Sequence, residues 1–144
     1  MTDAHVDPTR AAFDAFKAGA RDQPVSMLNL VRFRPHAVYP EGHADAGAGR
    51  TGAQAYAEYG RLSGPVFRRL GGEVIWRGAM QTMLIGPESE AWDAMFIAHY
   101  PSAGAFLAMV TDPDYKLAVV HRTAGVATSR LIRCRRLESG EGFA

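Results

Sequence analysis

Apolar residues recur along this chain with two different spacings, and glycine and proline separate the segments that they mark. Apolar positions three or four residues apart predict helices at about residues 8–20, 51–70, 103–110 and 113–125. Runs rich in β-branched and aromatic residues predict strands at about residues 25–33, 73–85, 91–100 and 129–137. The chain is therefore expected to fold as an N-terminal helix followed by the order β-α-β-β-α-β, in which the second α consists of two consecutive helices.

This order is that of the ferredoxin-like split βαβ motif, which predicts an α+β fold with a four-stranded antiparallel sheet and helices on one face. The strand at 25–33 is apolar on both sides, because Met27 and Val31 alternate with Leu28 and Leu30. Helices cover only one side of such a sheet, and no further element is predicted to cover the other. A second copy of the sheet is the simplest cover, so we expect a homodimer of the dimeric α/β-barrel type.

The length of 144 residues predicts a single domain over 1–144, with a core at about 24–137. The segment 34–50 has no apolar period and contains Pro35, Pro40 and three glycines. Long segments of this kind are usually functional or disordered, so we expect a mobile loop or a lid at the mouth of a site.

Charge and cysteine content exclude several classes of protein. Sixteen basic residues balance fifteen acidic ones, so neither nucleic acid nor a membrane surface is expected as a partner. Cys134 is the only cysteine, which excludes an internal disulfide. The N-terminus lacks the pattern of a secretory signal, and no apolar run approaches the ~20 residues of a membrane helix, so a cytoplasmic location is expected.

The motifs of common cofactor sites are absent from the sequence. There is no phosphate-binding glycine loop and no His-Glu-x-x-His helix, so we expect neither a metal nor an organic cofactor. Four residues of metal-ligand types occur in the segment 34–50, namely His36, Glu41, His43 and Asp45. Their spacing matches no known site, which favours a solvated loop.

An ordered set of short motifs resembles a known family. The set comprises Pro24-Val25-Ser26-Met27-Leu28-Asn29-Leu30-Val31-Arg32-Phe33, Tyr56-x-x-Tyr59, Gly71-Gly72 with Trp76-x-Gly78, Trp92-Asp93, Tyr100-Pro101-Ser102, Asp112-Pro113-x-Tyr115 and His121-Arg122. In this order the chain resembles the domain-of-unknown-function 1330 family over about residues 24–133. The resemblance implies a ferredoxin-like fold and a dimeric α/β barrel, and it brings no established catalytic residues. The wider superfamily includes cofactor-free monooxygenases, lactone isomerases, haem peroxidases and ligand-sensing regulators, so the fold alone selects no function.

Two polar residues on apolar strands are the candidates for catalysis. Asn29 lies among apolar neighbours, where it is either a satisfied core amide or a group that faces a cavity. Histidine is a common general acid or base, so His99 is either an acid, base or hydrogen-bond donor, or a buried histidine without a chemical role.

Four further residues are the candidates for ligand binding. Arg122 either binds an anion or offsets the dipole at the end of its helix. Tyr56 and Tyr59 are either core aromatics or side chains whose hydroxyls enter a pocket, and Trp76 is either a packing residue or a pocket wall.

These residues support two functional hypotheses. The first is a small-molecule-binding protein or cofactor-independent enzyme, with proton transfer or oxygenation of a small carbonyl, phenolic or carboxylate compound in a pocket of each protomer. The second is a non-catalytic ligand-binding or stress-response dimer. Convergence of the polar candidates on one cavity would favour catalysis.

Overall fold

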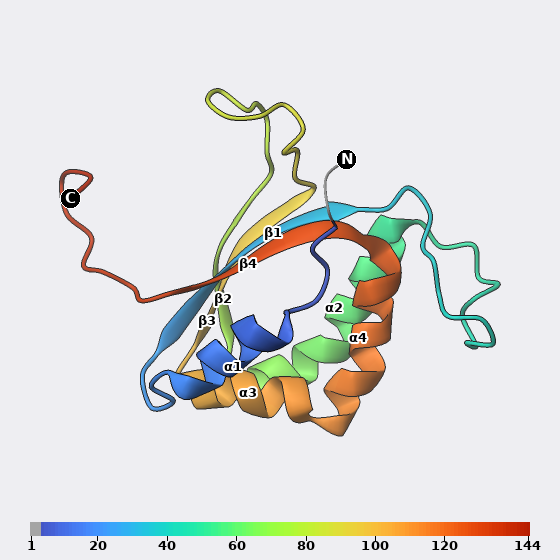
Figure 1. Ribbon diagram of the computed structural model, residues 1–144, viewed down its shortest axis with the longest axis horizontal. Helices are drawn as coiled ribbons and strands as arrows, with labels where there is room; N and C mark the ends of the chain where they lie inside the picture. Colours follow the sequence, from blue (N-terminus) through green and yellow to red (C-terminus); the bar gives the residue numbers. More distant parts are fainter. Residues whose placement is uncertain (1–3) are drawn as a thin grey trace.

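The computed structural model describes residues 4–144 and shows a four-stranded antiparallel sheet with helices on one face (Figure 1). In chain order the elements are α1 (Arg10–Ala18), β1 (Val25–Phe33), α2 (Gly52–Arg69), β2 (Glu73–Gly78), β3 (Ala94–Tyr100), α3 (Ala103–Thr111), α4 (Pro113–Gly125) and β4 (Val126–Cys134). The strand order across the sheet is β2-β3-β1-β4, and each neighbouring pair is antiparallel. The predicted ferredoxin-like α+β class is therefore confirmed.

Side-chain caps start the helices where the sequence predicts them. The Thr51 hydroxyl accepts a hydrogen bond from the backbone N–H of Gln54 at 3.1 Å, and the Gln54 side chain accepts one from the N–H of Thr51 at 2.9 Å. Asp112 caps α4 in the same way, through the N–H of Asp114 at 2.8 Å. Within residues 4–144, none of the helices has both the length and the apolar character that a membrane crossing requires.

Cross-strand register decides which side chains share a face of the sheet. The inner face, toward the helices, carries Met27, Asn29 and Val31 of β1, Ala94, Phe96 and Ala98 of β3, and Ser129 and Leu131 of β4. The outer face carries Leu28, Leu30, Met95, Ile97 and Ile132. The predicted apolar character of both faces is thus confirmed, and no described element covers the outer one (Figure 1).

The core lies between the inner face of the sheet and the helices. Its buried members are Val25, Met27, Val66, Ala98, Tyr100, Ala103, Phe106, Met109 and Tyr115. They come from both central strands and from α2, α3 and α4, so burial of this cluster holds the two layers together.

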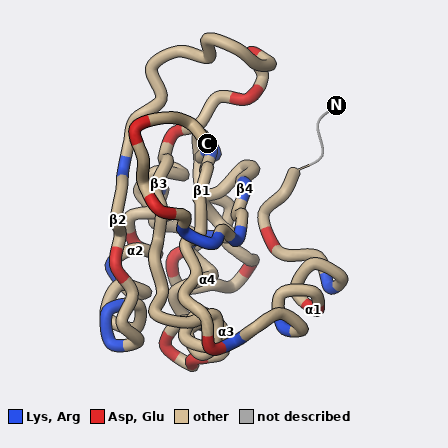
Figure 2. Tube along the Cα trace, turned by 90° about the vertical axis from the view of Figure 1, so that its left-hand side faces the viewer, with Lys and Arg blue, Asp and Glu red and all other residues tan. Residues whose placement is uncertain are grey.

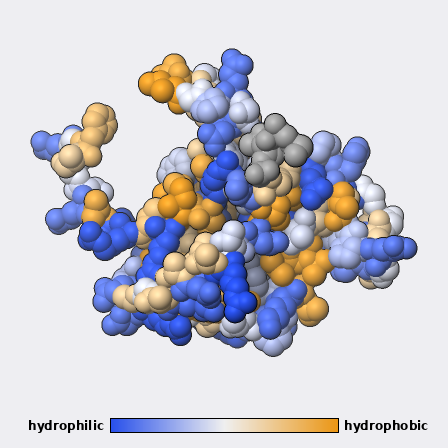
Figure 3. All heavy atoms as spheres, viewed as in Figure 1, coloured by the Kyte–Doolittle hydropathy of each residue, from blue (hydrophilic) through white to orange (hydrophobic). Residues whose placement is uncertain are grey.

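The predicted strand at 73–85 is too long. Pairing between β2 and β3 ends at Gly78, opposite Met95, and beyond it no neighbouring strand supplies hydrogen bonds. The segment 79–93 instead forms an irregular loop that projects from the sheet (Figure 1), and hydrophobic side chains gather at the end of this projection (Figure 3). Leu84 and Ile85 of this segment are exposed.

Boundaries of three other predicted elements shift by a few residues. β3 begins at Ala94 rather than at 91, and β4 spans Val126–Cys134 rather than 129–137. α1 begins at Arg10, because the Thr9 hydroxyl accepts the cap hydrogen bond from Ala12.

The segment 34–50 is anchored to the helices. The N–H of Ala37 donates to the carbonyl of Arg50 at 3.0 Å, and the N–H of Val38 donates to the carbonyl of Ala124 at 2.9 Å. The expectation that little holds this segment is therefore wrong. The sequence could not show these anchors, because the end of α4 that supplies Ala124 is remote along the chain.

Figure 2 shows that α1 and the residues preceding it lie beside β4, apart from the pair formed by α2 and α4. None of the residues of α1 is buried. This peripheral layer adds one more wall to the space between the sheet and the helices.

Candidate functional site

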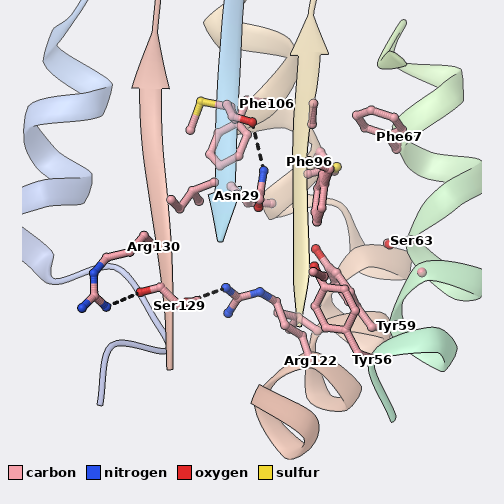
Figure 4. A pocket seen from close by; sticks show the side chains of 18 of the residues that line it. Asn29, Tyr56, Tyr59, Ser63, Phe67, Phe96, Phe106, Arg122, Ser129 and Arg130 are labelled. Atoms are coloured by element: carbon pink, nitrogen blue, oxygen red, sulfur yellow. Dashed lines mark hydrogen bonds between the residues drawn. The ribbon is translucent and has the colours of Figure 1, made fainter. Parts of the chain in front are cut away.

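A large pocket occupies the space between the inner face of the sheet and the helices, with a volume of about 1910 Å³. Strands β1, β3 and β4 form one wall, α2 and α4 form the opposite wall, and the segment 5–16 closes a third side (Figure 4). Most of the lining is apolar, including Met27, Phe33, Phe67, Phe96, Phe106, Met109 and Val119. A concave, mostly apolar pocket with a few polar groups is typical of small-molecule sites.

Arg122 is the cation at the floor of this pocket. Its guanidinium extends from α4 toward β4, where it donates to the Ser129 hydroxyl at 3.1 Å (Figure 4). A second nitrogen donates to the backbone carbonyl of Val6 at 2.5 Å. Within residues 4–144 no carboxylate lies within 4.0 Å of the guanidinium, and the hydrogen-bond partners that the protein supplies to it are neutral oxygens.

Three tyrosines stand next to Arg122. Tyr56 and Tyr59 extend from α2 (Figure 4), and the Tyr59 hydroxyl lies 3.0 Å from that of Tyr115 on α4. Burial raises the pKa of Tyr56 and of Tyr115 well above the ordinary value, and the charge of Arg122 offsets only part of that rise. These two phenols therefore stay protonated at neutral pH, where they can donate hydrogen bonds.

Asn29 lies on the same wall of the pocket as Ser129. Its side-chain nitrogen donates to the carbonyl of Met27 at 3.0 Å, and within the described chain its side-chain oxygen accepts no hydrogen bond. Val31 is the register partner of Ser129, and it is two residues from Asn29 on the same face. Diagonal neighbours of this kind are about 7–8 Å apart, so the amide and the Arg122–Ser129 pair face one cavity.

The structure separates His99 from this group. His99 pairs with Ser26 across β1 and β3, and its Nδ1 lies 2.9 Å from the Ser26 hydroxyl. Side chains alternate between the two faces of a strand, and Phe96 occupies the inner face, so His99 lies on the outer face. The prediction that His99 joins Asn29 and Arg122 in one site is wrong.

Trp76, a candidate for ligand binding, also lies outside the pocket. It pairs with Ile97 on the outer face, it does not line the pocket, and 48% of its surface is exposed. Glu73, Val74, Arg77 and Gly78 are the β2 residues that line the pocket. A register shift between Val74 and Trp76 inserts an extra residue, which the sequence pattern does not reveal.

Two polar lining residues were missing from the candidates. Ser129 is buried on β4 beside Arg122, and Tyr115 is buried on α4 beside Tyr59. Ser129 and Leu131 alternate along the predicted strand at 129–137, but this alternation does not show which face of the strand meets the helices. For Tyr115 the signal was its seven-residue separation from Arg122, which places both on one helical face.

A second polar cluster lies between segment 34–50 and α4, outside the pocket. The Tyr39 hydroxyl lies 2.7 Å from Nδ1 of His121 and accepts a hydrogen bond from Arg50 at 3.1 Å. Oδ2 of Asp45 lies 3.9 Å from His121 and 3.9 Å from His43. Across residues 4–144, no group of three or more His, Cys, Asp and Glu side chains is arranged to hold a metal ion.

This cluster does not form a lid over the pocket. None of the residues of 34–50 lines it, so the proposed role of this segment at the mouth of the site is not supported. The cluster instead attaches the segment to the face of α4 that carries His121.

Fold and pocket together define a ferredoxin-like α+β protein. Its pocket, between the sheet and the helices, is mostly apolar and has polar groups at its floor. The chain belongs to the family described as Domain of unknown function (DUF1330), whose sequence profile matches residues 49–133. The matched region begins later than the resemblance at 24–133 suggested, so β1 lies outside it. A search of proteins with curated functions finds no match to this chain.

Solved structures of similar fold include two that are also similar in sequence. A crystal structure described as the methylated RPA0582 protein is 53% identical, covers 97% of this chain and 100% of its own, and superposes with a TM-score of 0.89. A crystal structure of RPA0582, described as a protein of unknown function from Rhodopseudomonas palustris, is also 53% identical, covers 95% of this chain and 100% of its own, and has a TM-score of 0.88. An uncharacterized NIPSNAP-like domain protein from Burkholderia xenovorans is 12% identical over 85% of this chain and 93% of its own, with a TM-score of 0.52, and shares the fold alone.

Proposed function

We propose that this protein binds an organic acid with a bulky apolar body in the pocket between its sheet and its helices. The observation that carries the proposal is the guanidinium of Arg122, which faces an apolar pocket with no carboxylate within 4.0 Å among the described residues. An anionic oxygen of a carboxylate, phenolate or enolate is the natural partner for such a cation.

The neighbouring groups suit such a ligand. Protonated Tyr56 and Tyr115 supply hydrogen-bond donors around the same oxygen, because burial keeps their pKa high. Phe67, Phe96 and Phe106 supply an apolar surface for the body of the ligand, farther from Arg122 (Figure 4). A ligand that buries both parts gains from apolar burial and from a charge-assisted hydrogen bond.

The cofactor-independent enzyme is the second candidate, and the same donors favour it. Hydrogen-bond donors that stabilise an oxyanion promote reactions through enolate or phenolate intermediates. Tyr56 and Tyr115 remain protonated at neutral pH, however, because burial raises their pKa, so they donate rather than remove protons. Ligand binding is therefore the function that the pocket supports best.

We further propose that the protein forms a homodimer through the outer face of its sheet. The outer face of the sheet carries Leu28, Leu30, Met95, Ile97 and Ile132, and a matching sheet from a second copy would bury them. Contiguous apolar patches of this kind mark interaction surfaces. The pocket lies on the opposite face, so each protomer keeps its own ligand site.

Calorimetry with 2-naphthoate tests the binding proposal, with methyl 2-naphthoate as the neutral control. We expect saturable binding of the acid by the wild-type protein and at least ~10-fold weaker binding by Arg122→Gln, because hydrogen bonds to charged groups are worth about 1.5–3 kcal/mol. Arg68→Gln is the matched control, since Arg68 is an exposed arginine at the rim of the same pocket. It should bind within about twofold of wild type.

Equal affinities for wild type and a folded Arg122→Gln would contradict the proposal, as would equal affinities for the acid and its ester. Arg122→Lys keeps the charge and loses the planar pair of donors, so intermediate binding is expected. Circular dichroism of each variant shows whether the fold is retained.

A further inference from the structure

The residues before α1 are attached to the floor of the pocket. The carbonyl of His5 accepts hydrogen bonds from the N–H of Ser129 at 2.7 Å and from its hydroxyl at 2.8 Å. The N–H of His5 donates to the Thr128 hydroxyl at 3.1 Å. Arg122 then holds the next residue through the carbonyl of Val6 at 2.5 Å.

The helix that follows is held only at its far end. Arg133 donates to the carbonyls of Phe16 at 3.2 Å and Ala20 at 2.8 Å, and the Phe16 ring packs on Phe106 with 5.0 Å between centroids. Phe13 and Phe16 line the pocket, yet none of the residues of α1 is buried. We call residues 4–18 the N-terminal strap.

We propose that the N-terminal strap is a gate that an anionic ligand opens by taking Arg122 away from the carbonyl of Val6. The inference rests on the proposed function, because it assigns Arg122 to the ligand. One guanidinium is thus both the anchor of the strap and the receptor for the ligand's charged oxygen.

The competition follows from the acceptors involved. A carboxylate accepts a stronger hydrogen bond from a guanidinium than a peptide carbonyl does. Ser129 links Arg122 to His5, because its hydroxyl accepts a hydrogen bond from Arg122 and donates one to the carbonyl of His5. A ligand that draws the guanidinium toward the pocket therefore weakens both attachments of the strap.

The position of the strap also favours a gate at this place. The strap is the peripheral wall of the pocket (Figure 2), so its displacement exposes the pocket without disturbing the sheet or the contact between α2 and α4. Linkage also requires reciprocity: if the ligand weakens the anchor, loss of the anchor must change the affinity for the ligand.

Amide hydrogen exchange of the unliganded protein, followed residue by residue by NMR, tests the anchor. The N–H of Ser129 reports on it directly, because its acceptor is the carbonyl of His5. Arg122→Gln should speed its exchange at least ~10-fold. Arg133→Gln releases only the far end of α1 and is the matched control, with exchange of the Ser129 amide within about twofold of wild type.

Unchanged exchange at Ser129 in a folded Arg122→Gln would overturn the inference without any ligand. The second arm adds saturating 2-naphthoate to the wild-type protein. We expect faster exchange at Ser129 and His5 and unchanged or slower exchange in α2 around Tyr56.

Outcomes of the second arm separate the two proposals. If calorimetry shows that 2-naphthoate binds while exchange at Ser129 stays the same or slows, the gate is wrong and the binding function stands. If 2-naphthoate and its ring analogues bind nowhere, the binding function fails, and the ligand-opened gate fails with it.

Discussion

Gly52 and Gly125 meet backbone to backbone at the point where α2 begins and α4 ends. A methyl group on Gly52 would lie 2.7 Å from the carbonyl oxygen of Gly125, and one on Gly125 would lie 2.5 Å from the carbonyl oxygen of Gly52. Both distances are shorter than any van der Waals contact allows. The contact sets how closely the two helices that carry Tyr56 and Arg122 approach each other.

We therefore predict opposite effects for two glycine-to-alanine changes in α2. Gly52→Ala should lower the free energy of unfolding by about 1–3 kcal/mol or more, because backbone atoms must move. Gly60→Ala should raise it by up to about 1 kcal/mol, because Gly60 is exposed, nothing lies within 4 Å of the added carbon, and alanine favours the helix. Urea unfolding at one protein concentration measures both, and a neutral Gly52→Ala would contradict the packing described.

His121 links stability to pH. Its ring is 5% exposed, and burial is the largest effect on its pKa, which lies below the usual value of 6.5. The charged groups that face it are Asp45, Glu58, Arg50 and His43; the two carboxylates raise this pKa and the other two lower it. The unfolded chain therefore binds a proton that the folded chain resists, and this contribution to stability is complete above about pH 6.5 and is lost as the pH falls below it.

Urea midpoints at pH 7.5 and pH 5.0 measure the effect. The drop between them should be smaller in His121→Gln than in wild type. His36→Gln, in which an exposed histidine of segment 34–50 is replaced, should keep the wild-type drop. If His121→Gln keeps it in full, other groups account for the pH dependence.

The outer face of the sheet should mediate dimerisation. Ile97 lies at its centre, between Leu28 of β1 and Trp76 of β2. Ile97→Lys places a charge in the expected interface, so sedimentation equilibrium at micromolar concentration should show a monomer where wild type is a dimer. Leu117→Lys changes a leucine that is 71% exposed on α4 and should leave the dimer intact. A monomeric wild type would remove the basis of the barrel.

His99 should not take part in ligand binding. Because it lies on the outer face with Ser26, His99→Ala should change the affinity for 2-naphthoate by less than about twofold. Asn29→Ala, on the inner face, should weaken binding. The same calorimetry that tests Arg122 measures both, and a large loss in a dimeric His99→Ala would mean that the site includes the outer face.

Several residues that line the pocket could be predicted from patterns along the chain. Tyr56 and Tyr59 were predicted on one helix, and Arg122 on another, at positions that do line the pocket. Helical spacing and capping residues are local properties, so they locate such side chains without knowledge of the fold. Ser129 was missed because alternation along the predicted strand at 129–137 does not show which of its two faces meets the helices.

The sequence by itself determined the element order and the two apolar faces of the strands, because alternation and capping depend on neighbouring residues. Only the tertiary structure decided that Asn29 faces the pocket with Arg122 while His99 faces outward. Side chains alternate between the two faces of a strand, so the register of β3 against β1 decides which residues of β3 face inward. Asn29 pairs with Phe96, and a shift of one residue would exchange the inward and outward side chains of β3. That register depends on contacts between segments some 70 residues apart. The anchors of segment 34–50 on α4 and of the N-terminal strap on Arg122 join residues 82 and 116 positions apart.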